Sequence, residues 1–115
     1  MMMKDIESAR RAEERGMILR TLREDYTSIM TSVASLAHAL DSIRVSLSPE
    51  SMDFHLVYLF DQGYIQIWRA KDMPRFRTDR TAGWTEASRI MFAKLLPLGV
   101  QLIDGDVPAD PKVNF

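Results

Sequence analysis

The sequence SPESMDFHLVYLFDQGYIQIWR, residues 48–69, decides the fold. Ser48 supplies a hydroxyl that can cap a helix, Pro49 suits the first helical turn, and Glu50 places a negative charge at the positive end of the helix dipole. The sequence therefore predicts a helix over residues 49–62. The apolar side chains that we expect on its buried face are Met52, Leu56, Leu59 and Phe60.

A β-hairpin is predicted directly after this helix. Gly63 stands where a helix C-terminus favours a left-handed residue, so the helix is expected to end there. Residues 64–69 then follow a pattern with a period of two and contain β-branched and aromatic side chains, as is typical of a strand. Residues 89–94 have the composition to pair antiparallel with that strand across a long loop, residues 72–88.

A helix is also predicted over residues 5–25, which contain no proline and carry opposite charges at helical spacing. Its apolar side is thin up to Gly16 and thickens from Met17, so we expect only its second half to be anchored in a core. Residues 26–30 suit either a short edge strand or a turn.

Two further helices complete the predicted elements. Thr31 or Ser32 can cap a helix over residues 33–43. The residues expected on its buried face are Val33, Leu36, Ala37, Leu40 and Ile43. Pro97 can open a last helix that runs to Asp104 and stops at Gly105.

Length and composition limit the possible classes. A chain of 115 residues suits one domain, which we divide into a helical extension (residues 1–15), the domain proper (16–106) and a C-terminal tail (107–115). The absence of cysteine excludes disulfides, a thiolate nucleophile and sulfur-ligated zinc. No apolar run approaches the roughly 20 residues that cross a bilayer, and no apolar segment follows the N-terminus, so no membrane contact and a cytoplasmic location are expected.

The order of the predicted elements is that of a winged-helix domain, a helix-turn-helix followed by a β-hairpin wing. Residues 56–65, LVYLFDQGYI, resemble the pattern L-x-x-L-x-x-x-G-(L/Y)-(I/V) at the end of the third helix in bacterial winged-helix proteins. Residues 17–22 and 93–100, with Gly105 after them, resemble small winged-helix proteins of Mu-like prophages. The resemblance covers roughly residues 17–112.

This resemblance implies an α+β, mainly helical fold: a three-helix core plus a β-hairpin wing, preceded by an N-terminal helical extension. It also implies DNA binding or transcription regulation in a phage. The candidate nucleic-acid-binding residues are Arg69, Lys71, Arg75, Arg77, Arg80, Ser51 and His55.

The candidate DNA contacts divide between the wing and the third helix. Residues 69–80 carry five cations against Asp72 and Asp79, a local charge of +3 that suits phosphate contact; an ordinary solvated loop is the alternative. The exposed face expected for the third helix includes Ser51 and His55, but three acids and no lysine or arginine. We therefore expect the wing to dominate any binding to duplex DNA.

The alternative function is a winged-helix protein-interaction module that does not bind nucleic acid. The exposed aromatic residues expected at such an interface are Phe54, Tyr58 and Trp84. A homodimer through the N-terminal helix is also plausible, because a helical extension without a core of its own often packs on a second subunit.

No enzyme, cofactor or metal site is predicted. His38 and His55 are both expected on helix surfaces, and two unlinked histidines make a poor metal site. The glycines are isolated from one another, so no phosphate-binding loop is present. Residues 104–106, Asp-Gly-Asp, lack the spacing and the distal glutamate of a calcium loop.

Overall fold

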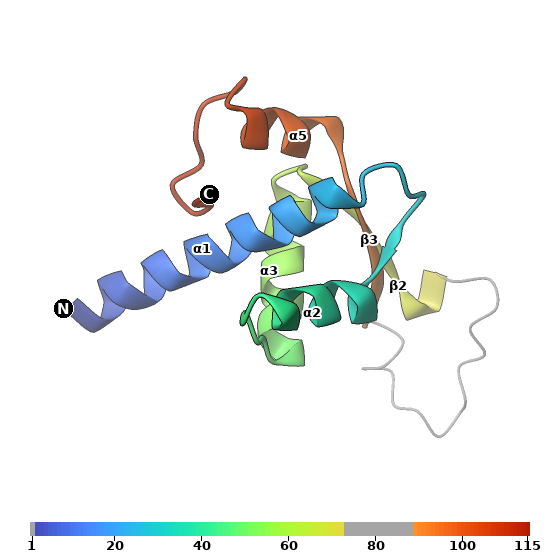
Figure 1. Cartoon of the computed structure of the whole chain (residues 1–115), viewed down its shortest axis with the longest axis horizontal. Helices are drawn as coiled ribbons and strands as arrows, with labels where there is room; N and C mark the ends of the chain where they lie inside the picture. Colours follow the sequence, from blue (N-terminus) through green and yellow to red (C-terminus); the bar gives the residue numbers. More distant parts are fainter. Residues whose placement is uncertain (1, 73–88) are drawn as a thin grey trace.

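The computed structural model of the chain describes residues 2–72 and 89–115 (Figure 1). Within these ranges, four helices and a three-stranded antiparallel sheet form an α+β fold. The elements are α1 (Met2–Glu24), β1 (Thr31–Ser32), α2 (Val33–Ser42), α3 (Pro49–Asp61), β2 (Ile65–Arg69), the short 3-10 helix η1 (Ala70–Asp72), β3 (Ile90–Leu95) and α5 (Pro97–Asp104).

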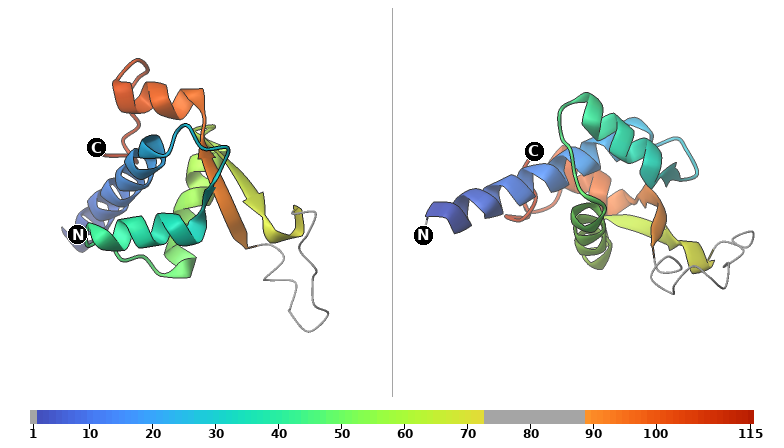
Figure 2. Two further views of the ribbon diagram at one scale, coloured as in Figure 1. Left: turned by 45° about the vertical axis from the view of Figure 1, so that its right-hand side comes forward. Right: turned by 90° about the horizontal axis from the view of Figure 1, so that it is seen from below.

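Helix α1 extends beyond the other elements at its N-terminal end (Figure 2). Residues 6–11 are exposed, whereas Ala12 and Arg15 are buried, so anchoring begins one turn before Gly16 and earlier than the sequence predicts. The prediction that Met17 joins the core is wrong, because its side chain is 39% exposed. At 100° per residue, Met17 lies on the side of α1 opposite the fully buried Leu22 and its neighbours.

The segment between α1 and α2 is a turn followed by the two-residue strand β1. Asp25 holds this turn by accepting hydrogen bonds from Ser28 Oγ and Thr31 Oγ1. Ser32 is the N-cap of α2, and its Oγ accepts a hydrogen bond from Ser35 N at 3.0 Å. Ile43, predicted on the buried face of α2, is 51% exposed, because the helix ends at Ser42 and Ile43 is its C-cap.

The predicted third helix is confirmed as α3, with Ser48 as its N-cap and Gly63 in the left-handed region at φ +82°. Two of its side chains differ from expectation. Phe60, predicted buried, is 41% exposed, and His55, predicted on the surface, is 2% exposed. His55 follows Met52 by three residues and precedes Leu59 by four, so it lies on the same helical face as these buried side chains.

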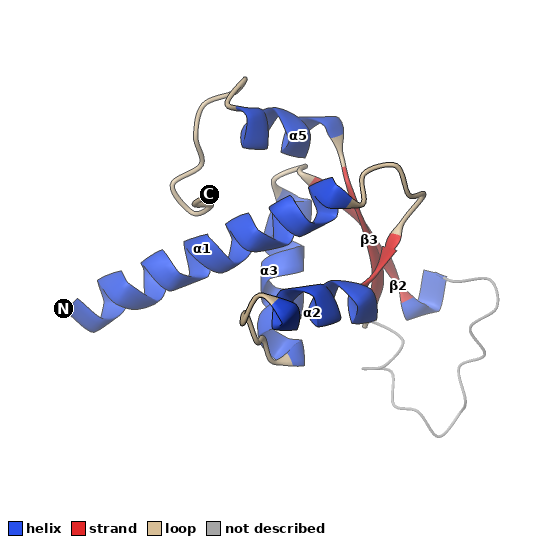
Figure 3. Cartoon of the chain, viewed as in Figure 1, coloured by secondary structure: helices blue, strands red, loops and turns tan. Residues whose placement is uncertain are grey.

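The predicted hairpin is confirmed: β2 and β3 pair antiparallel, with Ile65 opposite Leu95 and Ile67 opposite Ala93. Strand β1 adds to the other edge of β3, which gives the sheet order β1-β3-β2 (Figure 3). This order of helices and strands is compatible with a winged-helix-like fold. Apart from Asp72, the predicted loop of residues 72–88 lies outside the described residues.

The helices and the sheet enclose one apolar core. Leu56 and Leu59 of α3 share it, as predicted. Their fully buried partners on α1 and α2 are Ile18, Leu22, Leu36 and Leu40. Helix α5 is confirmed with its stop at Gly105, φ +78°. None of the helices in residues 2–72 and 89–115 is long and apolar enough to cross a membrane.

The C-terminal tail, residues 107–115, contains no helix or strand but returns to α1 (Figure 1). Asn114 N donates a hydrogen bond to Ala12 O at 2.9 Å, and Val113 is 6% exposed. Gly16 permits this approach, because a Cβ on it would lie 1.9 Å from Asn114 O. The tail is therefore packed on the fold.

Replacing Leu59 by alanine is expected to lower the free energy of unfolding by about 2–5 kcal/mol, because it leaves a cavity in the shared core. Urea unfolding followed by circular dichroism measures this change. Ile29→Ala is the control, because Ile29 is 81% exposed and its truncation should change stability by less than about 0.5 kcal/mol. A loss below about 1 kcal/mol for Leu59→Ala would contradict the assigned core.

Candidate interaction surface

The structure describes four of the seven candidate nucleic-acid-binding residues. Arg75, Arg77 and Arg80 lie outside the described residues. Arg69 is the last residue of β2 and is half-buried, and Lys71 is exposed in η1. The described part of the predicted wing contact is thus the base of the hairpin.

The two candidates on α3 lie in different surroundings. Ser51 is half-buried in the first turn, where its Oγ lies 3.0 Å from the capping Oγ of Ser48. His55 is buried beneath α1. The prediction of a surface histidine at this position is therefore wrong, and His55 is not exposed for contact with a macromolecule.

The cations at the base of the hairpin face an acid of α3. Asp53 is half-buried, and burial raises the pKa of its carboxyl, while the positive charges of Arg89 and Arg69 act in the opposite direction. Both arginines are thus within electrostatic reach of Asp53, which offsets part of their positive charge.

The side of α3 that faces away from the core combines acids with apolar side chains. Phe54 is 56% and Phe60 41% exposed, and α3 contains no lysine or arginine. We define the α3 outer face as Glu50, Asp53, Phe54, Phe60 and Asp61. Its charge at neutral pH is negative, which is opposite to the charge that phosphate contact requires.

Contacts from α1 fix one edge of this surface. The guanidinium carbons of Arg15 and Arg11 lie 5.5 and 5.9 Å from the ring centroid of Phe54. The Phe54 ring also meets the His55 ring edge-on, at 5.9 Å between centroids. Although Phe54 is exposed, its ring thus packs against two guanidinium groups and one aromatic ring.

A second edge is covered by the C-terminal tail. Tyr58 and Tyr64 both donate their hydroxyl hydrogens to Asp110 Oδ2, at 2.8 and 2.9 Å. Burial, together with this hydrogen bond and the negative charge of Asp110, raises the pKa of each tyrosine to about 12. Burial of Asp110 opposes its ionisation, but hydrogen bonds from Lys112 N and the two hydroxyls prevail and lower its pKa.

Arg15 links this tail to the buried histidine. Its Nε donates to His55 Nδ1 at 3.1 Å, its Nη1 donates to Lys112 O at 3.1 Å, and its guanidinium lies 4.3 Å from the Tyr58 ring centroid. His55 Nε2 lies 3.5 Å from Glu14 Oε1. Three segments distant in the sequence, α1, α3 and the C-terminal tail, therefore meet in one polar cluster.

Sequence reasoning missed this cluster. Arg15 and His55 are 40 positions apart, and Tyr58 and Asp110 are 52 apart, so no local pattern joins them. The one available signal was the spacing of His55 from Met52 and Leu59, which places it on the buried face of the helix.

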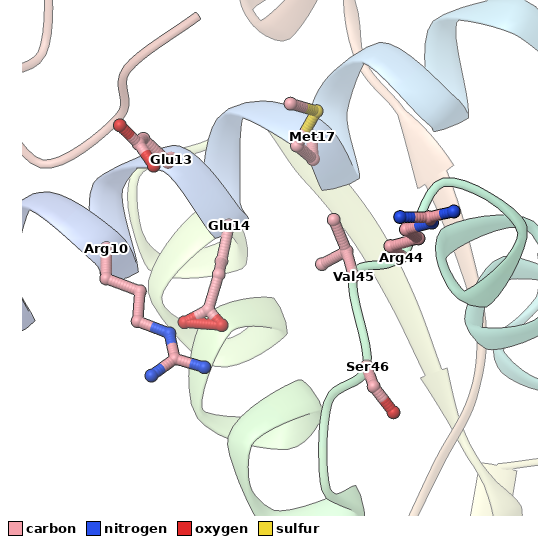
Figure 4. Close-up of a pocket in the computed structure, with 7 residues that line it drawn as sticks. All are labelled: Arg10, Glu13, Glu14, Met17, Arg44, Val45 and Ser46. Carbon is pink, nitrogen blue, oxygen red and sulfur yellow. The ribbon is translucent and has the colours of Figure 1, made fainter.

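A shallow polar hollow of about 190 Å³ lies between α1 and the segment that joins α2 to α3 (Figure 4). The side chains that line it are Arg10, Glu13, Glu14, Met17, Arg44, Val45 and Ser46. Because two arginines stand beside two glutamates, the hollow has no net charge to attract an anion. Arg44 has a φ of +65°, where its left-handed conformation closes the C-terminus of α2.

No protein-family model, curated protein or solved structure matched this chain. Among the residues that the structure describes, no group of three or more histidine, aspartate or glutamate side chains is placed to hold a metal ion. The contacts of the chain itself therefore carry the functional inference.

Because Tyr58 and Tyr64 share Asp110 as their hydrogen-bond acceptor, we expect both phenols to lose their protons only at strongly alkaline pH. Tyr58 and Tyr64, two of the three tyrosines, should ionise near pH 12, and the native state should lose stability as the pH rises from 10, where unfolded tyrosine ionises, towards 12. Ultraviolet absorbance of tyrosinate measures this titration. Asp110→Asn should move both pKa values towards 10, because it removes the negative charge.

The matched control is Asp106→Asn, at an exposed aspartate close to the tail. It should leave the tyrosine titration unchanged. An unchanged titration in Asp110→Asn would contradict the assigned contacts.

Proposed function

We propose that this chain is a winged-helix domain that binds another protein through the α3 outer face. The order of helices and strands supports the winged-helix assignment, because the third helix leads directly into the hairpin. The observation that carries the functional proposal is the surface of α3, where exposed phenylalanines stand among acids and the helix itself contributes no lysine or arginine.

This surface suits a protein better than DNA. Glu50, Asp53 and Asp61 would face phosphates if α3 entered a groove, and their negative charges would repel them. Exposed aromatic side chains, by contrast, supply much of the binding energy at protein interfaces. Phe54 and Phe60 are therefore the expected anchors of the complex.

The charge of the surface indicates the chemistry of the partner. Acids placed between apolar anchors are complementary to a segment that presents lysine or arginine beside apolar side chains. An amphipathic helix with one apolar and basic face has this composition. We therefore expect the partner to offer such a segment to the α3 outer face.

Duplex DNA bound through the wing is the second candidate function, as in a phage-type regulator. It is supported by the cations at the base of the hairpin, Arg69, Lys71 and Arg89, which precede and follow the sequence that holds three more arginines. Because the acids of α3 would repel phosphates, we expect DNA to be contacted through the hairpin and not through α3. Binding would then be weakly sequence-specific, since phosphate contacts carry little sequence information.

A homodimer through α1 receives less support. The exposed residues 6–11 include one large apolar side chain, Ile6, among charged and small residues. A stable interface usually has a larger apolar centre.

Binding to a helical peptide with leucine and lysine on one face tests the protein-binding proposal. Fluorescence anisotropy should show binding that weakens about tenfold or more in the double variant Phe54→Ala, Phe60→Ala, because the anchors are removed. The double variant Glu50→Gln, Asp61→Asn should bind more weakly at low salt and depend less on salt.

Two controls accompany this measurement. Ile29→Ala removes an exposed apolar side chain outside the α3 outer face and should bind as the unmodified chain does. A peptide with glutamate in place of lysine should bind poorly. Equal affinity for the two peptides, or no effect of the Phe54 and Phe60 changes, would contradict the proposal.

The DNA candidate predicts a different salt dependence. If the hairpin tracks phosphates, changing both Arg69 and Lys71 to alanine should lower the slope of log K against log salt by up to about 2. Anisotropy with a random-sequence duplex at several salt concentrations measures this slope. Tight, salt-dependent binding that survives the Phe54 and Phe60 changes would favour DNA over the protein partner.

A further inference from the structure

The C-terminal tail is attached to the helices at a small number of polar contacts. Arg15 Nη1 donates to Lys112 O, Asn114 N donates to Ala12 O, and Asp110 accepts from Tyr58 and Tyr64. Val113 adds the buried apolar contact of the tail. In both views of Figure 2 the C-terminus of the chain lies beside α1.

The hydrogen bond between Arg15 and His55 forms only when His55 Nδ1 carries no proton. A guanidinium only donates hydrogen bonds, so His55 Nδ1 must accept the bond from Arg15 Nε at 3.1 Å. The remaining proton of the neutral ring therefore lies on Nε2, which faces Glu14 Oε1 at 3.5 Å. At 2% exposure, the ring has little access to solvent that could replace these partners.

Charged and titratable groups surround His55 on each element packed against it. From α1, Arg15 and Arg11 oppose a positive charge on the ring, and Glu14 favours it. From α3, Tyr58 lies under the same guanidinium, and Glu50 lines a hollow shared with His55. From the tail, Asp110 and Lys112 lie around Tyr58 with opposite charges.

We propose that protonation of His55 releases the C-terminal tail from α1 and α3. A proton on Nδ1 turns the acceptor of the Arg15 Nε hydrogen bond into a donor, so two N–H groups point at each other. The ring also gains a positive charge next to the guanidinium. Arg15 must then move away, and its bond to Lys112 O and its contact with the Tyr58 ring are lost together.

The direction of the pH dependence follows from the same surroundings. Burial, and then the charge of Arg15, lower the pKa of His55 below its ordinary value of 6.5, although Glu14 acts to raise it. The unfolded or released state therefore binds the proton more readily than the packed state. Attachment of the tail is complete above pH 6.5 and weakens as the pH falls below it.

Release of the tail also changes the surface of α3. Tyr58 lies at the edge of the α3 outer face, where Asp110 and Lys112 of the tail contact it. A released tail would expose this ring and leave the Phe54 ring without the Arg15 contact. Protonation of His55 removes one of the attachments of the tail, the bond from Arg15 to Lys112 O, and this step does not depend on the proposed partner.

Hydrogen exchange of the full-length chain tests this inference. The amide of Asn114 donates to Ala12 O, so its exchange reports directly on the attached tail. After correction for the intrinsic pH dependence of exchange, its protection should fall about tenfold or more between about pH 7.5 and about pH 5. Core amides such as that of Leu59 should remain far more protected than Asn114 at both pH values, because they exchange only when the fold itself opens.

Two variants assign the effect to His55. His55→Asn keeps an acceptor near the position of Nδ1 but cannot be protonated, so the protection of Asn114 should no longer depend on pH in this range. His38→Asn changes the exposed histidine of α2 and should keep the full pH dependence. Circular dichroism establishes that each variant is folded.

Glu14→Gln provides a test that leaves the imidazole in place. Because Glu14 raises the pKa of His55 in the packed state, its removal should widen the difference from the released state and make the loss of protection between about pH 7.5 and about pH 5 larger. Protection that is equal at both pH values in the unmodified chain would overturn the proposal. The same result follows if His55→Asn keeps the pH dependence or if Glu14→Gln leaves the size of the loss unchanged.

Discussion

Leu56 and Leu59 are fully buried against the first two helices, and this contact fixes the rotation of α3 about its own axis. The period of the helix then determines which residues face outwards, so Glu50, Phe54 and Asp61 are on the solvent side. The same rotation turns His55 towards Arg15. Both the outer face and the polar cluster thus depend on one apolar contact.

Local signals in the sequence were sufficient for most of the helix and strand positions. Ser48 and Pro49 start α3, and Gly63 ends it in the left-handed region, because these residues act through their own backbone and nearest neighbours. The pairing of β2 with β3 followed from composition and from the position of the strands after the helix.

The predictions of burial were wrong at positions where packing between distant elements determines whether a side chain is exposed. Phe60 is apolar but lies beside the buried stripe of α3, Met17 is apolar but lies on the side of α1 opposite the buried residues, and His55 is polar but lies within the buried stripe. The tail could not be predicted, because Asp110 and Asn114 find their partners on helices far away in the sequence. Long-range contacts between single polar residues leave no periodic pattern to detect.

The two proposals meet at Tyr58. Its position on α3 makes it a neighbour of the acidic and aromatic surface, and its hydroxyl is held by the tail. Arg15 contacts Tyr58, Phe54 and His55 at once. In the proposed release, one side chain would therefore connect a change of charge at the buried histidine to the exposed surface.

Mapping of amide chemical shifts during titration with the leucine–lysine helical peptide tests the central claim most directly, because it locates binding residue by residue. The account predicts that the largest changes fall on residues 50–61, with smaller ones on the neighbouring turn of α1. Changes confined to the base of the hairpin around Arg69 and Lys71, or to the exposed residues 6–11 of α1, would contradict it.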